Sequence, residues 1–159
     1  KYMSKKIILS LIILVPFFLS SCGYKRLYES DEKKIYIKNI EVAGDKRIGY
    51  SLKNDILLSS SPNASNILNI ELNIDRSKTV KDKNKSGKIT KYTVFINAKI
   101  VIENIRTSKK IEKTFANSDV YEVLNSPSET LSNEKNSIKN ITKQISEDIT
   151  NFINFYYKD

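Results

Sequence analysis

The chain has 159 residues, which is enough for a leader and one domain and too short for two domains of the usual size. It contains no His, no Trp and a single Cys, which excludes Ser-His-Asp or Cys-His catalysis, a His or multi-Cys metal site and an internal disulfide. The formal charge of +9 accompanies a composition rich in Ile, Lys and Asn, which is typical of AT-rich genomes, so the charge alone is not taken as a sign of binding.

The first residues have the three parts of an export signal. Met3 is the only Met of the chain, and we expect translation to start there, with Lys1 and Tyr2 an extension. A short basic segment follows, and then residues 7–19 are apolar apart from one Ser. A helix of that length falls well short of the roughly 30 Å hydrocarbon core, so a cleavable signal is favoured over a permanent membrane span.

The end of this segment, Leu19-Ser20-Ser21-Cys22-Gly23, resembles the signal of bacterial lipoproteins, which has Leu, two small residues and then Cys. The Cys thiol of such signals receives a diacylglyceryl group, and cleavage leaves the lipidated Cys as the first residue. The alternative is an ordinary secretory signal followed by a chance Cys. The resemblance predicts a covalent lipid on Cys22, and Gly23 after it favours the outer membrane. The predicted organisation is a signal peptide at 1–21, a lipidated N-terminus and tether at 22–33, and a single domain at 34–159.

The mature chain begins with a strand and a helix. Residues 34–42 alternate as a strand with three isoleucines on one face, of which Ile40 joins the others through a shift of register. Residues 46–58 carry apolar side chains at the spacing of a helix, and Asp45 is a suitable N-cap. The Ser- and Pro-containing segment 59–63 ends that helix.

Three further strands are predicted. Residues 68–75 alternate strictly between apolar and polar side chains, so this strand has one apolar and one solvent-facing side. Residues 92–103 alternate over a longer stretch, with Phe95 and Val101 interrupting the more polar side. The basic segment 81–88 lies between them, and the two strands are expected to form a long antiparallel hairpin. A turn at 104–108 then leads into a third antiparallel strand within 111–123.

A long helix closes the chain. Ser128 or Ser132 is the expected N-cap, and the apolar stripe of this helix is formed by Leu131, Ile138, Ile141, Ile145, Ile149, Phe152 and Tyr156. A sheet with one apolar face buries that face under the two amphipathic helices. The predicted fold is therefore α+β, a two-layer sandwich in which a four-stranded antiparallel or mixed sheet has both helices packed on one face.

This organisation resembles the LPS-assembly lipoprotein (LptE) family. The matching features are Cys22-Gly23-Tyr24, the order of strands and helices, the run 114–121 and a C-terminal helix that carries Glu134 in its first turns. One departure is the presence of polar residues where many members carry Ala, at Asn136, Lys139 and Asn140. The resemblance implies a non-enzymatic protein that helps to assemble and plug an outer-membrane β-barrel translocon (LptD-like), and that helps to deliver lipopolysaccharide to the outer leaflet. The implied location is the periplasmic side of the outer membrane, with no cofactor besides the lipid on Cys22.

The basic residues around the hairpin are the candidate site for anions such as the phosphates of lipopolysaccharide. The candidates are Arg76, Lys78, Lys85, Lys88 and Lys91, with Lys81 and Lys83 in the same cluster and Lys99 and Arg106 as weaker members. Arg76 and Lys91 are preferred because they are expected to flank the turn on strands. The alternative is a solvated turn. The aromatic residues Phe152, Phe155, Tyr156 and Tyr157 are interpreted as closing the core at the helix end, with a partner contact as the alternative.

Two other functions are alternatives on the sequence. An auxiliary lipoprotein of an ABC-type lipid transporter would also combine a lipoprotein signal with an α/β domain. A lipid-anchored enzyme is disfavoured because there is no His and no nucleophile–base pair, and the four Gly residues form no phosphate-binding loop. Nucleic acid is not an expected partner.

Overall fold

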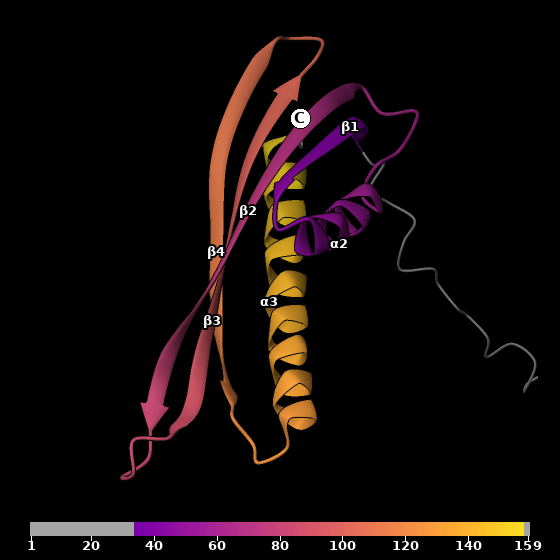
Figure 1. Cartoon of the computed structure of the whole chain (residues 1–159). Coiled ribbons are helices and arrows are strands. Elements are labelled where there is room, and N and C mark those ends of the chain that lie inside the picture. Colours follow the sequence, from indigo (N-terminus) through magenta and orange to yellow (C-terminus); the bar gives the residue numbers. More distant parts are fainter. Residues whose placement is uncertain (1–33, 158–159) are drawn as a thin grey trace, which may run out of the picture. The chain divides into compact units, whose positions relative to one another are not determined.

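The computed structural model describes residues 34–157, so the predicted signal peptide, Cys22 and the tether lie outside the described residues. Six elements follow one another along the chain (Figure 1). They are β1 (Ile35–Gly44), α2 (Lys46–Leu57), β2 (Asn66–Lys83), β3 (Ile89–Asn104), β4 (Lys109–Glu122) and α3 (Pro127–Tyr156).

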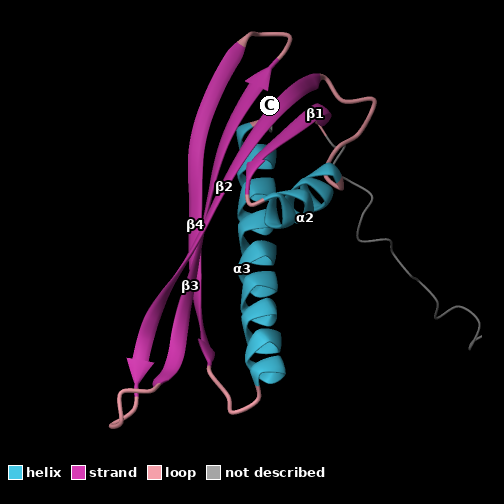
Figure 2. Cartoon of the chain, in the orientation of Figure 1, coloured by secondary structure: helices cyan, strands magenta, loops and turns pink. Residues whose placement is uncertain are grey.

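The strands form one mixed sheet in the order β1-β2-β3-β4. β1 is parallel to β2, and the two hairpins β2–β3 and β3–β4 are antiparallel. A parallel pair needs a crossover connection, which α2 supplies. Both helices lie on the same side of the sheet (Figure 2). The predicted α+β sandwich with two helices on one face is therefore confirmed.

The face of the sheet that the helices cover, called the inner face below, carries the core. Its alternating residues from β1, β2 and β3 are almost completely buried against the apolar stripes of the helices. A register shift between Ile37 and Asn39 returns Ile40 to this face, as the sequence predicted. The central members of the core are Leu52, Ile56, Leu68, Ile70, Leu72, Ile96, Ile100, Ile102, Ile141, Ile145 and Ile149.

The start of α2 is held by Asp45, which is its N-cap as predicted. The Oδ1 atom of Asp45 accepts hydrogen bonds from the backbone N–H groups of Arg47 and Ile48 at 3.1 and 3.2 Å. Gly44 precedes the cap with φ of +78°, and a Cβ there would collide with the Ile74 carbonyl of the neighbouring strand. Only Gly fits this link between β1 and α2.

Helix α3 begins earlier than predicted, and the expected caps Ser128 and Ser132 are wrong. The N-cap is Ser126, whose hydroxyl accepts a hydrogen bond from the backbone N–H of Glu129. Pro127 then occupies the first turn, where its fixed φ suits a helix and its missing N–H costs no hydrogen bond. Leu131, predicted in the apolar stripe, is 50% exposed.

The β2–β3 hairpin extends beyond the core. β2 runs to Lys83, nine residues past Ile74, and all of these nine residues are exposed. The turn itself is 84–88, where Asn84 accepts hydrogen bonds from the N–H groups of Ser86 and Lys88 and Gly87 adopts φ of +80°. The prediction that Arg76 flanks the turn is wrong, because Arg76 lies opposite Ile96, well back along the hairpin.

Candidate functional site

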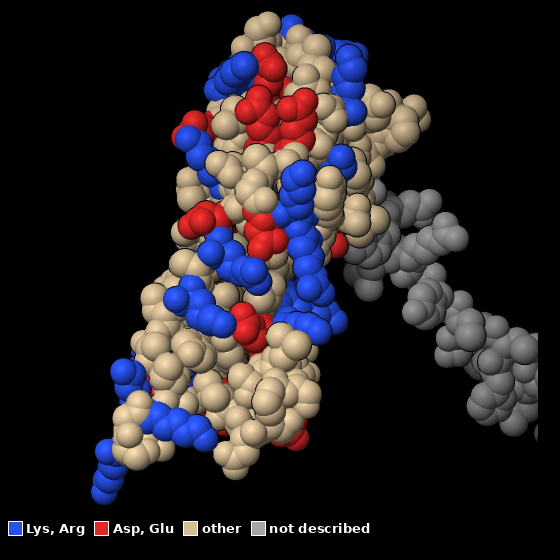
Figure 3. Space-filling model, in the orientation of Figure 1, with Lys and Arg blue, Asp and Glu red and all other residues tan. Residues whose placement is uncertain are grey.

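The predicted anion-binding residues lie on the projecting part of the hairpin, residues 75–97, which we call the hairpin arm. Figure 3 shows Lys and Arg side chains along this arm and at its tip. The arm continues the two-sided pattern of the sheet, so Arg76 and Lys78 lie on the inner face while Lys91 lies on the opposite, outer face. The structure therefore does not gather the candidate residues into one patch.

Arg76 is held by an acidic partner. Its Nε lies 3.2 Å from Oδ2 of Asp45, the residue whose other oxygen caps α2. The pair connects the base of the hairpin arm to the start of the helix. Arg76 is thus a neutralised cation with a structural role, which makes it a weaker anion site than its position in the sequence indicated.

Lys78 belongs to a polar cluster between the hairpin arm and α3. Its Nζ lies 3.3 and 3.4 Å from the carboxylate oxygens of Glu134, and 5.0 Å from the centre of the Tyr92 ring. Partial burial alone would lower the pKa of Lys78, but hydrogen bonding to Tyr121 and Glu134 and the charge of Glu134 outweigh it, so the pKa lies above 10.5. Burial raises the pKa of Tyr121 above 10.0, against the opposing effect of Lys78.

The tip of the arm is different. Lys91 makes only a long pair with Glu122 on the next strand, at 3.7 Å between exposed side chains. Lys85 and Lys88, in the turn, make no ion pair with any residue in the described part of the chain, and both are exposed. Exposed, unpaired ammonium groups attract phosphate at long range, and salt weakens this attraction. Of the predicted residues, Lys85 and Lys88 are the best placed to bind an anion.

The remaining predicted residues are distributed elsewhere. Lys99 pairs with Glu112 at 2.8 Å on the outer face of the sheet. Phe152, Tyr156 and Tyr157 pack against the core, as expected for residues that close a helix end, whereas Phe155 is 80% exposed. The aromatic group is therefore mostly structural.

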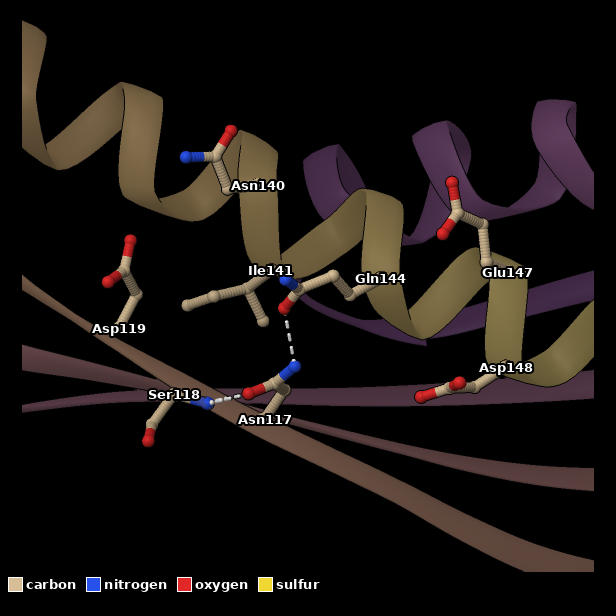
Figure 4. A pocket seen from close by; sticks show the side chains of 8 residues that line it. All are labelled: Asn117, Ser118, Asp119, Asn140, Ile141, Gln144, Glu147 and Asp148. Atoms are coloured by element: carbon tan, nitrogen blue, oxygen red, sulfur yellow. Dashed lines mark hydrogen bonds between the residues drawn. The ribbon is translucent and has the colours of Figure 1, made fainter.

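A polar cleft of about 650 Å³ between β4 and α3 was not anticipated from the sequence. Its lining residues are Asn117, Ser118, Asp119, Asn140, Ile141, Gln144, Glu147 and Asp148 (Figure 4). Asn117 donates a hydrogen bond to Gln144 across it at 2.6 Å. The sequence signal that could have predicted this cleft is the polar side of the last helix, which faces polar residues of β4. No basic side chain lines the cleft, so it does not favour an anion.

Two classes of feature are missing from residues 34–157. No group of three His, Cys, Asp or Glu side chains in this range could hold a metal ion. Within the same range, no helix combines the length and the apolar character needed to cross a membrane, because α3 is amphipathic.

Comparisons with known proteins identify the fold. No protein-family model matches the sequence. No curated protein matches it either. Solved structures of small bacterial lipoproteins do match, over most of the length of both chains. The chain thus has a fold that these lipoproteins also adopt.

Three of these structures illustrate the likeness. Lipoprotein B from Nitrosomonas europaea, described as uncharacterized, has a TM-score of 0.53 at 12% identity, covering 80% of this chain and 88% of that one. A candidate lipoprotein from Caulobacter crescentus has a TM-score of 0.52 at 10% identity, covering 75% and 90%. A minor lipoprotein from Acinetobacter baumannii has a TM-score of 0.50 at 17% identity, covering 74% and 93%. At such identities the likeness establishes the fold alone.

Proposed function

We propose that this chain is a non-enzymatic outer-membrane lipoprotein, anchored through Cys22, that helps to assemble and plug the β-barrel that translocates lipopolysaccharide. In this role it also helps to deliver lipopolysaccharide to the outer leaflet. The observation that carries the proposal is the combination of a lipoprotein-type signal ending at Cys22 with a fold that small lipoproteins from three bacteria share.

The distribution of polar and apolar surface supports a barrel partner. Both helices pack their apolar stripes against the inner face of the sheet. The outer face therefore remains uncovered by any element of residues 34–157. That outer face carries alternating polar residues such as Asn73, Asn97 and Thr114, with ion pairs between neighbouring strands. A broad polar surface suits the polar lumen of a barrel better than it suits lipid.

The hairpin tip supports a role toward lipopolysaccharide. Its unpaired Lys85 and Lys88 offer charge to phosphate groups without first breaking an internal ion pair. The tip also projects past the core, so it can reach a ligand without disturbing the helices (Figure 1).

Affinity purification tests the proposal. The tagged chain is extracted from outer membranes in mild detergent, and the co-purified proteins are identified by mass spectrometry. A large β-barrel recovered in a one-to-one ratio is the expected result. Recovery of an inner-membrane ABC transporter instead would overturn the proposal in favour of an auxiliary transporter lipoprotein.

A further inference from the structure

The outer edge of β4 divides into two parts that differ in how their backbone groups are used. β4 is an edge strand, because it pairs only with β3 (Figure 2). In an antiparallel strand, alternate residues direct their N–H and C=O groups toward the neighbour and away from it. Val123 donates its N–H to the Thr90 carbonyl of β3, so the odd-numbered residues face β3. The even-numbered residues therefore face outward.

The second half of this edge is occupied by local hydrogen bonds. The outward N–H of Ser118 is bonded to the side chain of Asn117, and that of Val120 to the side chain of Asp119, at 2.7 and 2.8 Å. The carbonyl of Glu122 accepts a hydrogen bond from Asn133 of α3. Another strand cannot pair here without displacing these contacts.

The first half of the edge lacks such contacts. The outward N–H groups of Glu112, Thr114 and Ala116 donate no hydrogen bond to any residue of the described range. All three residues are exposed. An open row of backbone groups of this kind is a template for another strand. Its length, from Lys110 to Ala116, matches the usual length of a strand.

The charged side chains of this half of the edge do not block pairing with another strand. Lys on an edge strand commonly blocks pairing by extending over the edge. Here Lys113 lies over the Phe152 ring at 4.2 Å and Lys109 over the Tyr156 ring at 5.2 Å, so both fold back onto α3. On the outer face, Lys110 pairs with Glu103 and Glu112 with Lys99, both on β3. The two inner-face lysines thus lie against α3, and the two outer-face charges pair with β3.

The opposite edge of the sheet shows the contrast. The first part of the outer edge of β1 is covered by neighbouring parts of the chain. Ser61 donates its N–H to the Ile35 carbonyl, Ser60 accepts from the Ile37 N–H, and Lys53 bonds the Ile40 carbonyl. The Ile35–Ile40 part of the β1 edge is thus bonded by the protein itself, whereas the first half of the β4 edge is left open.

We propose that the 110–116 segment of the β4 edge docks an extended, acid-rich segment of a partner protein, which adds to the sheet as a fifth strand. Charge complementarity selects this occupant, because residues 109–116 contain three Lys and one Glu. Side chains of an added strand would lie beside Lys109 and Lys113 on the inner face and Lys110 on the outer face. A second copy of the chain would bring the same excess of Lys to this edge. This inference does not depend on the proposed function.

Nuclear magnetic resonance with a defined peptide tests the proposal. The ¹⁵N-labelled full chain in detergent micelles is titrated with an acetylated, amidated peptide of sequence Thr-Glu-Val-Glu-Thr-Glu-Val. We expect the amide resonances of Glu112, Thr114 and Ala116 to shift, and their hydrogen exchange to slow by roughly tenfold at saturation. The amides of Ser118 and Val120 should not change. Absence of any change at the first three amides overturns the proposal.

Two matched controls separate the backbone and charge contributions. Thr114→Pro removes one outward N–H and should abolish binding, whereas Thr114→Ala keeps the N–H and should bind as the parent does. If Thr114→Pro unfolds the domain, methylation of alternate peptide nitrogens tests the same contact on the unaltered chain. Equal binding of a peptide with Lys in place of Glu would contradict the acidic partner. A concentration-dependent dimer that shifts the same amides without peptide would show that a second copy is the occupant.

Discussion

At the scale of single residues, Asp45 uses its two carboxylate oxygens for different purposes. One oxygen caps α2 and the other pairs with Arg76 on the neighbouring strand. A cap contributes about 1 kcal/mol, whereas an exposed ion pair contributes about 0.5 kcal/mol. The cap is therefore the larger of the two contributions.

This difference gives a stability prediction. Asp45→Ala should lower the free energy of unfolding by about 1–2 kcal/mol, because it removes both contacts. Asp45→Asn keeps a capping oxygen and should lose only about 0.5 kcal/mol. Urea denaturation measures both values. Equal losses in the two variants would show that the charge, and not the cap, is what matters.

The cluster of Lys78, Tyr121 and Glu134 predicts a loss of stability at alkaline pH. The pKa values of Lys78 and Tyr121 are both raised in the folded protein, so the folded state holds these protons more tightly than the unfolded state. Their contribution is complete below about pH 10 and is lost as the pH rises through the raised values. Glu134→Gln removes a cause of both shifts and should flatten this loss.

The measurement is the urea midpoint at pH 8 and pH 11 for the parent and for Glu134→Gln. Glu147→Gln is the matched control, since Glu147 pairs with Lys143 on the same helix and both side chains are exposed. An identical decline in the parent and Glu134→Gln would mean that the cluster does not set the alkaline behaviour.

Lipidation is also decided by a single residue. Cys22 is the only thiol of the chain, so Cys22→Ala should abolish labelling with a radioactive fatty acid and leave the signal uncleaved. Gel mobility and autoradiography measure both effects. Labelling that survives the substitution would rule out the lipoprotein interpretation.

At the scale of elements, hydrophobic periodicity predicted the strands and helices that touch the core. The alternation of residues 68–75 and the stripe of the last helix both arise because one side of each element must be buried. Periodicity did not predict how far β2 extends, because its last nine residues are held by backbone pairing with β3 and bury no apolar side chain.

The candidate site was predicted only in part for a related reason. The sequence shows where basic residues lie, and it does not show which of them have distant partners. Lys78 and Glu134 are 56 positions apart, and Arg76 meets Asp45 through the β1–β2 pairing. Lys85 and Lys88 remain available because their turn projects away from the rest of the domain.

The hairpin tip gives a prediction about anion binding. Lys85→Glu combined with Lys88→Glu should weaken binding of lipopolysaccharide and make the remaining affinity less sensitive to salt. Folding should be unaffected, because neither side chain contacts the core. Isothermal titration at low and moderate salt measures the effect.

Two exposed lysines of α3 provide the control for this experiment. Lys135→Glu combined with Lys139→Glu makes the same change in net charge on exposed positions away from the tip. We expect this variant to bind nearly as the parent does. If both double variants lose the same affinity, the tip has no special role and only the overall charge matters.

At the scale of the whole described domain, the two faces of the sheet have different roles. The inner face is filled by isoleucines and leucines and covered by both helices. The outer face is uncovered within residues 34–157 and is mostly polar, apart from the exposed apolar side chains of Phe95 and Val120. If the domain sits inside a barrel, this is the surface that we expect to meet the barrel wall.

Site-specific photo-cross-linking in growing cells tests this account most directly. A photoreactive amino acid is placed at Asn73 or Asn97 on the outer face, and at Lys143 on the exposed side of α3 as a control. The account predicts that both outer-face positions cross-link strongly to one large outer-membrane β-barrel, and that Lys143 does so weakly. Cross-links from the outer face to an inner-membrane transporter, or no barrel adduct from any of the three positions, would contradict it.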